Sequence, residues 1–101
     1  MSKNLIDTIQ ASLALPRAVE TGTHLGDGAR LLAASFAEVI TIELAPELAR
    51  KATEALRDAA NIRVLEGHSV ELIHTIAPGV PTLWFLDGHW SGGMTAGQDD
   101  E

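Results

Sequence analysis

The sequence predicts an α/β fold in which a parallel sheet is covered by helices on both sides. Short β-branched and apolar segments alternate along the chain with helical segments, a pattern typical of parallel strands joined by right-handed crossovers. The expected strands are apolar on both faces, which indicates a sheet buried between layers of helices. Glycines gather directly after the first expected strand, at the edge where such sheets bind ligands.

The N-terminal segment 2–14 is expected to form a helix, because apolar residues recur there at helical spacing and Ser2 is a suitable N-cap. The apolar face consists of Leu5, Ile6, Ile9 and Leu13. Pro16 ends this helix. Residues 17–21 (RAVET) are then expected to form a buried strand that leads into the glycine-containing loop 22–28.

The middle of the chain predicts two further helices and two further strands. Residues 28–36 form a helix, 39–43 (VITIE) a strand and 62–66 (IRVLE) another strand. Between these strands Pro46 begins a helix at the position that proline prefers. Its buried stripe is expected to consist of Leu48, Ala52, Ala55, Leu56 and Ala59.

The last expected elements are a short helix over 70–76, with Ser69 as its cap, and a strand over 82–87 (TLWFLD). The segment 88–101 is rich in glycine and is expected to be a loop. The order is therefore a helix followed by β-α-β-α-β-α-β.

Composition limits the class of protein. With 101 residues the chain is expected to form one domain, residues 1–101. Seven Lys and Arg stand against 14 Asp and Glu, a formal net charge of −7, which argues against nucleic acid or an anionic membrane as the partner. The absence of cysteine excludes disulfides, thiol nucleophiles and cysteine-bound zinc. No signal peptide or membrane helix is visible in the sequence, so we expect a soluble cytoplasmic protein.

The strongest functional signal is the loop after the first strand, which reads E-x-G-x-x-x-G-x-G from Glu20 to Gly28. Glycines at a strand-to-helix turn let the backbone approach a ligand closely. This spacing differs from the dinucleotide-binding pattern G-x-G-x-x-G, so a nicotinamide enzyme fits less well. The second signal is Glu43, which ends the second strand about 20 residues beyond the first glycine. In nucleotide-binding α/β folds an acid at this spacing accepts hydrogen bonds from the ribose hydroxyls.

With these motifs the sequence resembles the class I S-adenosylmethionine-dependent methyltransferases, which have a Rossmann-like fold. The glycine loop, Glu43 of ITIEL, Gly67 to Ser69 after the third strand, and Asp87 of LWFLDGHW follow the order of that family. The resemblance covers about residues 17–90. It implies a sheet order of 3-2-1-4 for the four strands and a chain truncated after the fourth of the family's strands.

The resemblance also implies S-adenosylmethionine as the cofactor and assigns residues to it. Around the methionine end it places Glu20, Gly22, Thr23 and Gly26. Glu43 would bind the ribose hydroxyls, and His68 and Ser69 would lie near the adenine. Asp87 would lie near the methionine amino group or the reaction centre.

Several of these residues have simpler readings. Glu20 and Glu43 could be acids that face water at the ends of strands, and His24 in the glycine loop could either flank the cofactor or be solvated. His89 could act as a general base toward an acceptor hydroxyl or merely be a loop residue. Asp87 and His89 together are too few ligands to predict a metal site.

Two functions follow as expectations. The first is methyl transfer from S-adenosylmethionine to a small acceptor, at oxygen. The alternative is a non-catalytic half-domain that binds S-adenosylmethionine or S-adenosylhomocysteine and needs self-association or a partner chain. In the order 3-2-1-4 the apolar strand 82–87 is an edge and invites pairing. We therefore expect this edge to be covered by a second copy of the chain, which would form a homo-oligomer, or by the N-terminal helix.

Overall fold

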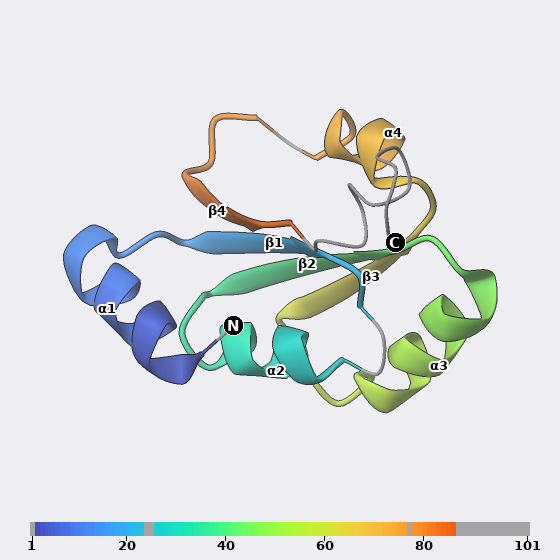
Figure 1. Ribbon diagram of the computed structural model, residues 1–101, viewed down its shortest axis with the longest axis horizontal. Helices are drawn as coiled ribbons and strands as arrows, with labels where there is room; N and C mark the ends of the chain where they lie inside the picture. The colour runs from blue at the N-terminus through green and yellow to red at the C-terminus, as the bar shows by residue number, and fades with distance from the viewer. Residues whose placement is uncertain (1, 24–25, 77, 87–101) are drawn as a thin grey trace, which may run out of the picture.

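The computed structural model describes residues 2–23, 26–76 and 78–86 of the 101-residue chain. Its strands form one parallel sheet in the order β3-β2-β1-β4, which confirms the predicted α/β fold and strand order. Figure 1 shows α1, α2 and α3 on one side of this sheet and α4 on the other. The elements are α1 (Lys3–Leu13), β1 (Arg17–Thr21), α2 (Asp27–Ala33), β2 (Glu38–Glu43), α3 (Pro46–Ala55), β3 (Ile62–Glu66), α4 (Ser69–Ile73) and β4 (Thr82–Phe85).

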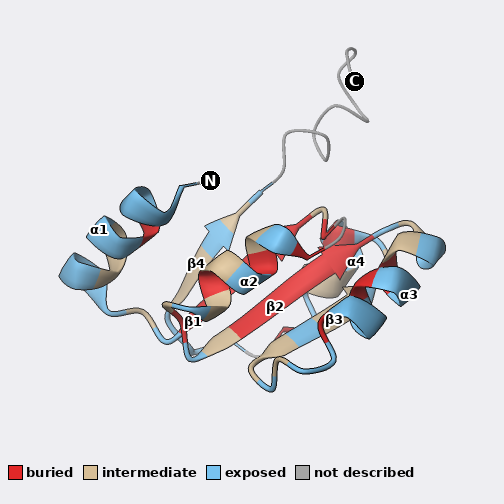
Figure 2. Ribbon diagram, turned by 90° about the horizontal axis from the view of Figure 1, so that it is seen from below, coloured by how far each residue is buried: buried red, intermediate tan, exposed pale blue. Residues whose placement is uncertain are grey.

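The core has two layers because successive side chains of a strand point to opposite faces of the sheet. Ala18 of β1 and Val39 of β2 pack in the layer under α1, α2 and α3. Val19 and Ile40, the next residue of each strand, pack in the layer under α4. Figure 2 shows that β2, between β1 and β3, is buried over nearly its whole length.

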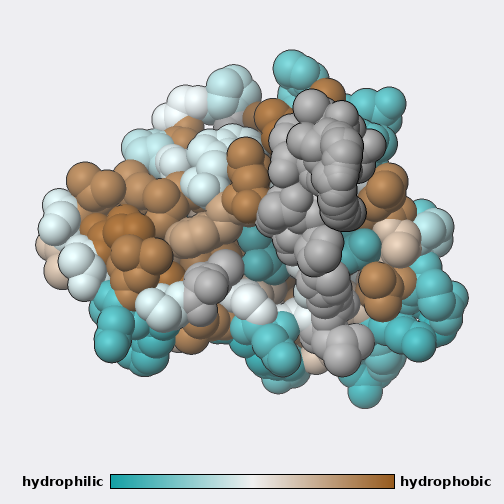
Figure 3. Space-filling view, in the orientation of Figure 1, coloured by the Kyte–Doolittle hydropathy of each residue, from teal (hydrophilic) through white to brown (hydrophobic). Residues whose placement is uncertain are grey.

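Helix α1 begins as predicted, since Ser2 is its N-cap and the Ser2 Oγ accepts a hydrogen bond from the Leu5 amide at 3.2 Å. The apolar face predicted for this helix is only partly buried. Ile6 is fully buried, but the side chains of Leu5 and Leu13 are 51% and 59% exposed. Figure 3 shows apolar surface on the side of the molecule where α1 lies.

A polar contact holds α1 in addition to the burial of Ile6. The Gln10 side-chain amide donates hydrogen bonds to the carbonyls of Leu15 and Ser35, each at 2.8 Å. Its amide oxygen accepts from the Leu15 N–H at 2.8 Å. One glutamine therefore joins the end of α1 to the segment that follows α2.

Two other helices differ from the prediction in detail. In α3 and the residue after it, the buried positions are Ala49, Ala52 and Leu56, spaced three and four residues apart, while Ala55 is exposed. In α4, His68 occupies the N-cap without a side-chain hydrogen bond, and Ser69 is the first helical residue. Ser69 therefore does not cap this helix as predicted.

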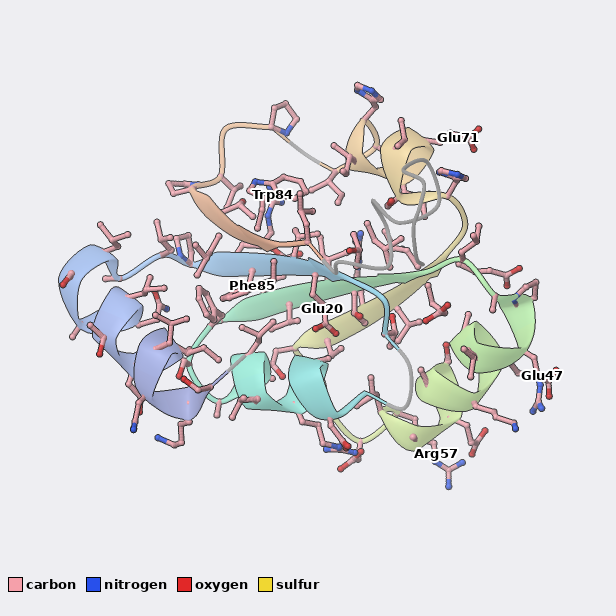
Figure 4. All side chains as sticks on the ribbon, viewed as in Figure 1. Glu20, Glu47, Arg57, Glu71, Trp84 and Phe85 are labelled. Carbon is pink, nitrogen blue, oxygen red and sulfur yellow. The ribbon has the colours of Figure 1, made fainter. Side chains whose placement is uncertain are left out.

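Strands β3 and β4 are the edges of the described sheet. Consecutive side chains of β4 point to opposite faces, as Figure 4 shows for Trp84 and Phe85. Phe85 packs against the core layer of α2, whereas Trp84 is 40% exposed. At the amino end of the strand, the Arg17 Nε donates a hydrogen bond to the Thr82 Oγ1 at 2.9 Å, which ties β4 to β1.

Candidate functional site

The carboxyl ends of β1, β2 and β3 meet at one edge of the sheet, and hydrogen bonds extend their pairing into the loops. The Gly22 amide donates to the Ile42 carbonyl at 2.8 Å, and the Gly67 amide donates to the Glu43 carbonyl at 2.9 Å. Both glycines have positive φ angles, +82° and +144°, which let the chain turn away from the sheet there. The loops after β1 and β3 therefore lie on either side of the end of β2.

Gly26 ends the loop after β1 and is the N-cap of α2. Its φ is +94°, and its amide donates a hydrogen bond to the Thr23 carbonyl at 2.9 Å. A Cβ placed on Gly26 would lie 2.9 Å from three carbon atoms of the Leu56 side chain. Glycine is therefore required both by the backbone conformation and by the close contact between this loop and the end of α3.

Glu20 is buried beneath the loop, on the face of the sheet covered by α2. Its side chain is 5% exposed, and Figure 4 shows it between β1 and α2. Thr41, its register partner on β2, donates a hydrogen bond from Oγ1 to the Glu20 Oε2 at 2.7 Å. The Thr23 Oγ1 lies 2.6 Å from the Thr41 Oγ1, so three polar side chains form a continuous chain from the loop to the acid.

Glu43 lies two residues beyond Thr41, on the same face and at the end of β2. Its side chain is 6% exposed, and its Oε2 accepts a hydrogen bond from the Ala45 amide at 3.1 Å. That bond holds the carboxylate beside the turn into α3. Glu20 and Glu43 are thus both buried acids rather than the water-exposed acids of the simpler reading.

Ser69 lies at the third strand end, after Gly67 and at the start of α4. The residue is 5% exposed, and its Oγ has no hydrogen-bond partner among the described residues. A buried hydroxyl without a hydrogen-bond partner lowers the stability of the fold. The Ser69 Oγ is therefore suited to form a hydrogen bond with a ligand, as donor or as acceptor. The neighbouring His68 is exposed.

The structure thus brings together Glu20, Gly22, Thr23, Gly26, Glu43, His68 and Ser69 at one edge of the sheet. The predicted residues His24, Asp87 and His89 lie outside the described residues. Sequence reasoning missed Thr41, although its position two residues before Glu43 on a strand places the two side chains on one face.

Across residues 2–23, 26–76 and 78–86, no group of three or more His, Cys, Asp or Glu side chains is arranged to hold a metal ion. No helix within those same ranges is long and apolar enough to cross a membrane.

No model of a known protein family matches this sequence, and no curated protein matches it. The fold, by contrast, matches solved structures. Cofactor-bound Rv0187 from MTB is 25% identical with a TM-score of 0.70, and the match covers 84% of this chain and 42% of that one. The SAH-bound methyltransferase PaMTH1 from Podospora anserina is 21% identical with a TM-score of 0.71, covering 87% and 42%.

The O-methyltransferase TomG from Streptomyces achromogenes, solved in complex with SAM, is 22% identical with a TM-score of 0.68. That match covers 85% of this chain and 43% of TomG. The chain therefore spans less than half the length of each of these structures. Over that length it has the Rossmann-like fold of these methyltransferase structures, as its resemblance to the class I S-adenosylmethionine-dependent methyltransferases implied.

Proposed function

We propose that this chain binds S-adenosylmethionine at the carboxyl edge of its sheet and that the bound cofactor serves methyl transfer to a small acceptor, at oxygen. The observation that carries the proposal is the pair of buried acids, Glu20 and Glu43, on adjacent strands next to the glycine turn. The fold shared with methyltransferase structures supports it, and the likeness to TomG favours oxygen as the accepting atom.

The residues of this edge fit such a cofactor. Glu43 is anchored by the Ala45 amide, and its carboxylate is suited to accept hydrogen bonds from ribose hydroxyls. Glu20 is suited to attract the cationic methionine end. The buried Oγ of Ser69 offers one further polar partner near the adenine. Thr23 and the glycines Gly22 and Gly26 supply the turn that lets backbone approach the ligand.

The acidic character of the edge separates this proposal from a nicotinamide enzyme. A pyrophosphate carries negative charge and binds where amides and cations surround it. Here Glu20, buried under the first turn, places a carboxylate close to where that pyrophosphate would lie. Like charges at such a site disfavour a dinucleotide and favour a ligand with a cationic end.

When bound, S-adenosylmethionine supplies a methyl group already activated by its sulfonium. The contribution of the chain is therefore to hold the ligand in one orientation and to exclude water. Orientation comes from two fixed carboxylates on adjacent strands, Glu20 of β1 and Glu43 of β2. The proposal that His89 removes a proton from the acceptor hydroxyl concerns a residue outside the described part.

A second candidate is a module that binds the cofactor without transferring the methyl group on its own. It requires only the cofactor-facing residues of the sheet edge, such as Glu20, Glu43 and Ser69, and no residue that takes a proton from an acceptor. A methyl-transfer assay over a mixed panel of acceptors separates the two candidates. Turnover by this chain alone supports the enzyme, and binding without turnover supports the module.

Calorimetry with S-adenosylmethionine and S-adenosylhomocysteine tests the binding itself. Glu43→Gln is expected to weaken binding by roughly 10- to 100-fold, the cost of a lost hydrogen bond to a charged group. Glu38→Gln is the matched control, because it makes the same change at the opposite end of β2. Binding to neither compound would refute the proposal, and equal losses in the two variants would refute the role of Glu43.

A further inference from the structure

The buried threonine of β2 has a role that neither its packing nor the proposed ligand contacts explain. Thr41 is fully buried in a strand whose neighbouring positions are Ile40 and Ile42. Valine would fill almost the same volume without a hydroxyl that needs a partner. The hydroxyl is nevertheless bonded on both sides, to Glu20 at 2.7 Å and to Thr23 at 2.6 Å.

The chemistry of the three side chains gives these bonds a direction. An ionised carboxylate only accepts hydrogen bonds, and a hydroxyl has one proton to donate. Thr41 uses that proton on Glu20, so the Thr23 hydroxyl must donate to Thr41. The result is a polarised chain, Thr23 to Thr41 to Glu20, which ends on the carboxyl group.

This chain joins the turn to the sheet at a second point. The backbone already fixes Gly22, whose amide bonds to Ile42, and the turn is closed by the bond from the Gly26 amide to the Thr23 carbonyl. The hydrogen bond between the Thr23 and Thr41 hydroxyls ties this closed turn to the sheet face that bears Glu20. Thr41 therefore stands between the acid and the turn.

We propose that Thr41 is a positioning residue of the candidate site, which fixes the buried Glu20 and the glycine turn as one unit before a ligand arrives. Its effect on ligand affinity rests on the proposed function, whereas its effect on the turn does not. Thr41 touches no ligand in this account, and it acts only through Glu20 and Thr23.

Two substitutions separate this role from packing. Thr41→Val keeps the volume and removes the hydroxyl, whereas Thr41→Ser keeps the hydroxyl and removes a methyl group. Thr53→Val is the control for losing a threonine hydroxyl elsewhere, because the Thr53 Oγ1 donates to the Ala49 carbonyl within its own helix, α3. Thr23→Val breaks the chain at the loop end and replaces Thr41→Val if that variant does not fold.

The first readout is amide hydrogen exchange at Gly26, measured on the full chain without ligand. We expect Thr41→Val to speed exchange about tenfold, the equivalent of one lost hydrogen bond, while Thr41→Ser and Thr53→Val exchange like the parent. Parent-like exchange in Thr41→Val, or equal acceleration in Thr41→Ser, would overturn the proposal.

The second readout is the affinity for S-adenosylhomocysteine. We expect Thr41→Val to bind about tenfold or more weakly and Thr41→Ser to bind like the parent. If the parent binds and Thr41→Val binds equally well, the proposal is overturned. If the parent does not bind, the proposed function fails, and the exchange at Gly26 alone decides the role of Thr41.

Discussion

Gly26 lies directly against the side chain of Leu56, close enough that a methyl group on Gly26 would stand 2.9 Å from the Leu56 Cγ. The contact joins the loop after β1 to the end of α3, and Leu56 is itself buried in the larger core layer. The conformation of the ligand-facing turn is therefore tied to the packing of the core beneath it. A substitution at either residue should therefore change both the conformation of the turn and the packing around Leu56.

Gly26→Ala is expected to lower the free energy of unfolding by about 1–3 kcal/mol, from backbone strain at φ +94° and from the clash with Leu56. Gly79→Ala is the matched control, because Gly79 has a similar φ of +86° but nothing within 4 Å of its added Cβ. Urea denaturation measures both variants. Equal losses would show that the Leu56 contact contributes nothing beyond the strain.

The ion pair between α2 and the segment after α3 predicts a dependence of stability on pH. The Arg30 Nη2 donates to the Ala55 carbonyl and to the Asp58 Oδ1, each at 2.7 Å. The hydrogen bond from Arg30 lowers the pKa of Asp58 below its ordinary value of 3.8. The pair therefore stabilises the fold above that ordinary value, and the contribution is lost as the pH falls through the lowered pKa.

Asp58→Asn should accordingly melt at a lower temperature than the parent at pH 7, and the gap should close on acidification below about pH 4. Both residues are exposed, so the shift should be small and should shrink in high salt. Thermal melts followed by circular dichroism over this range measure it. Glu71→Gln in α4 is a control at another exposed acid, and a gap that persists at low pH would contradict the assignment.

The edge strand β4 leads us to propose that a second copy of the chain pairs with it. Within the described sheet β4 bonds to β1 alone, and the exposed apolar residues Trp84 and Leu86 lie at and just after it. A two-fold pairing would satisfy both open edges and cover both tryptophans. Sedimentation velocity should show a dimer that Trp84→Lys disrupts and Leu44→Lys, at a residue after β2, does not. A parent that stays monomeric at high concentration would contradict the pairing.

The order of helices and strands could be predicted well from the sequence, because the prolines, the apolar spacing and the β-branched segments all indicate the same elements. Proline at 46 and the apolar strand segments mark boundaries that the structure reproduces within a few residues. The partial burial of the apolar face of α1 could not be predicted, because helical spacing indicates which side chains share a face but not what covers them. The Gln10 contact that joins this helix to the rest of the chain is made to Ser35, which only the folded chain brings near.

The residues of the candidate site that lie at the ends of strands could be predicted from the sequence. Glu20 and Glu43 stand out as acids at the ends of apolar strands, and the turn glycines stand out by their spacing. Thr41 did not, because a threonine inside a β-branched strand is ordinary. Its importance arises from the register that sets it opposite Glu20, and register is a property of the assembled sheet.

The most direct test of the account maps where a ligand binds. Titration of S-adenosylhomocysteine into the isotope-labelled chain, followed by amide NMR spectra, should shift the signals of Gly22, Thr23, Gly26 and Gly67 at the carboxyl edge. Signals from the opposite edge, such as those of Arg17 and Glu38, should stay in place. Shifts confined to that opposite edge, or no shifts at saturating ligand, would contradict the proposal that this edge of the sheet is a binding site for S-adenosylmethionine.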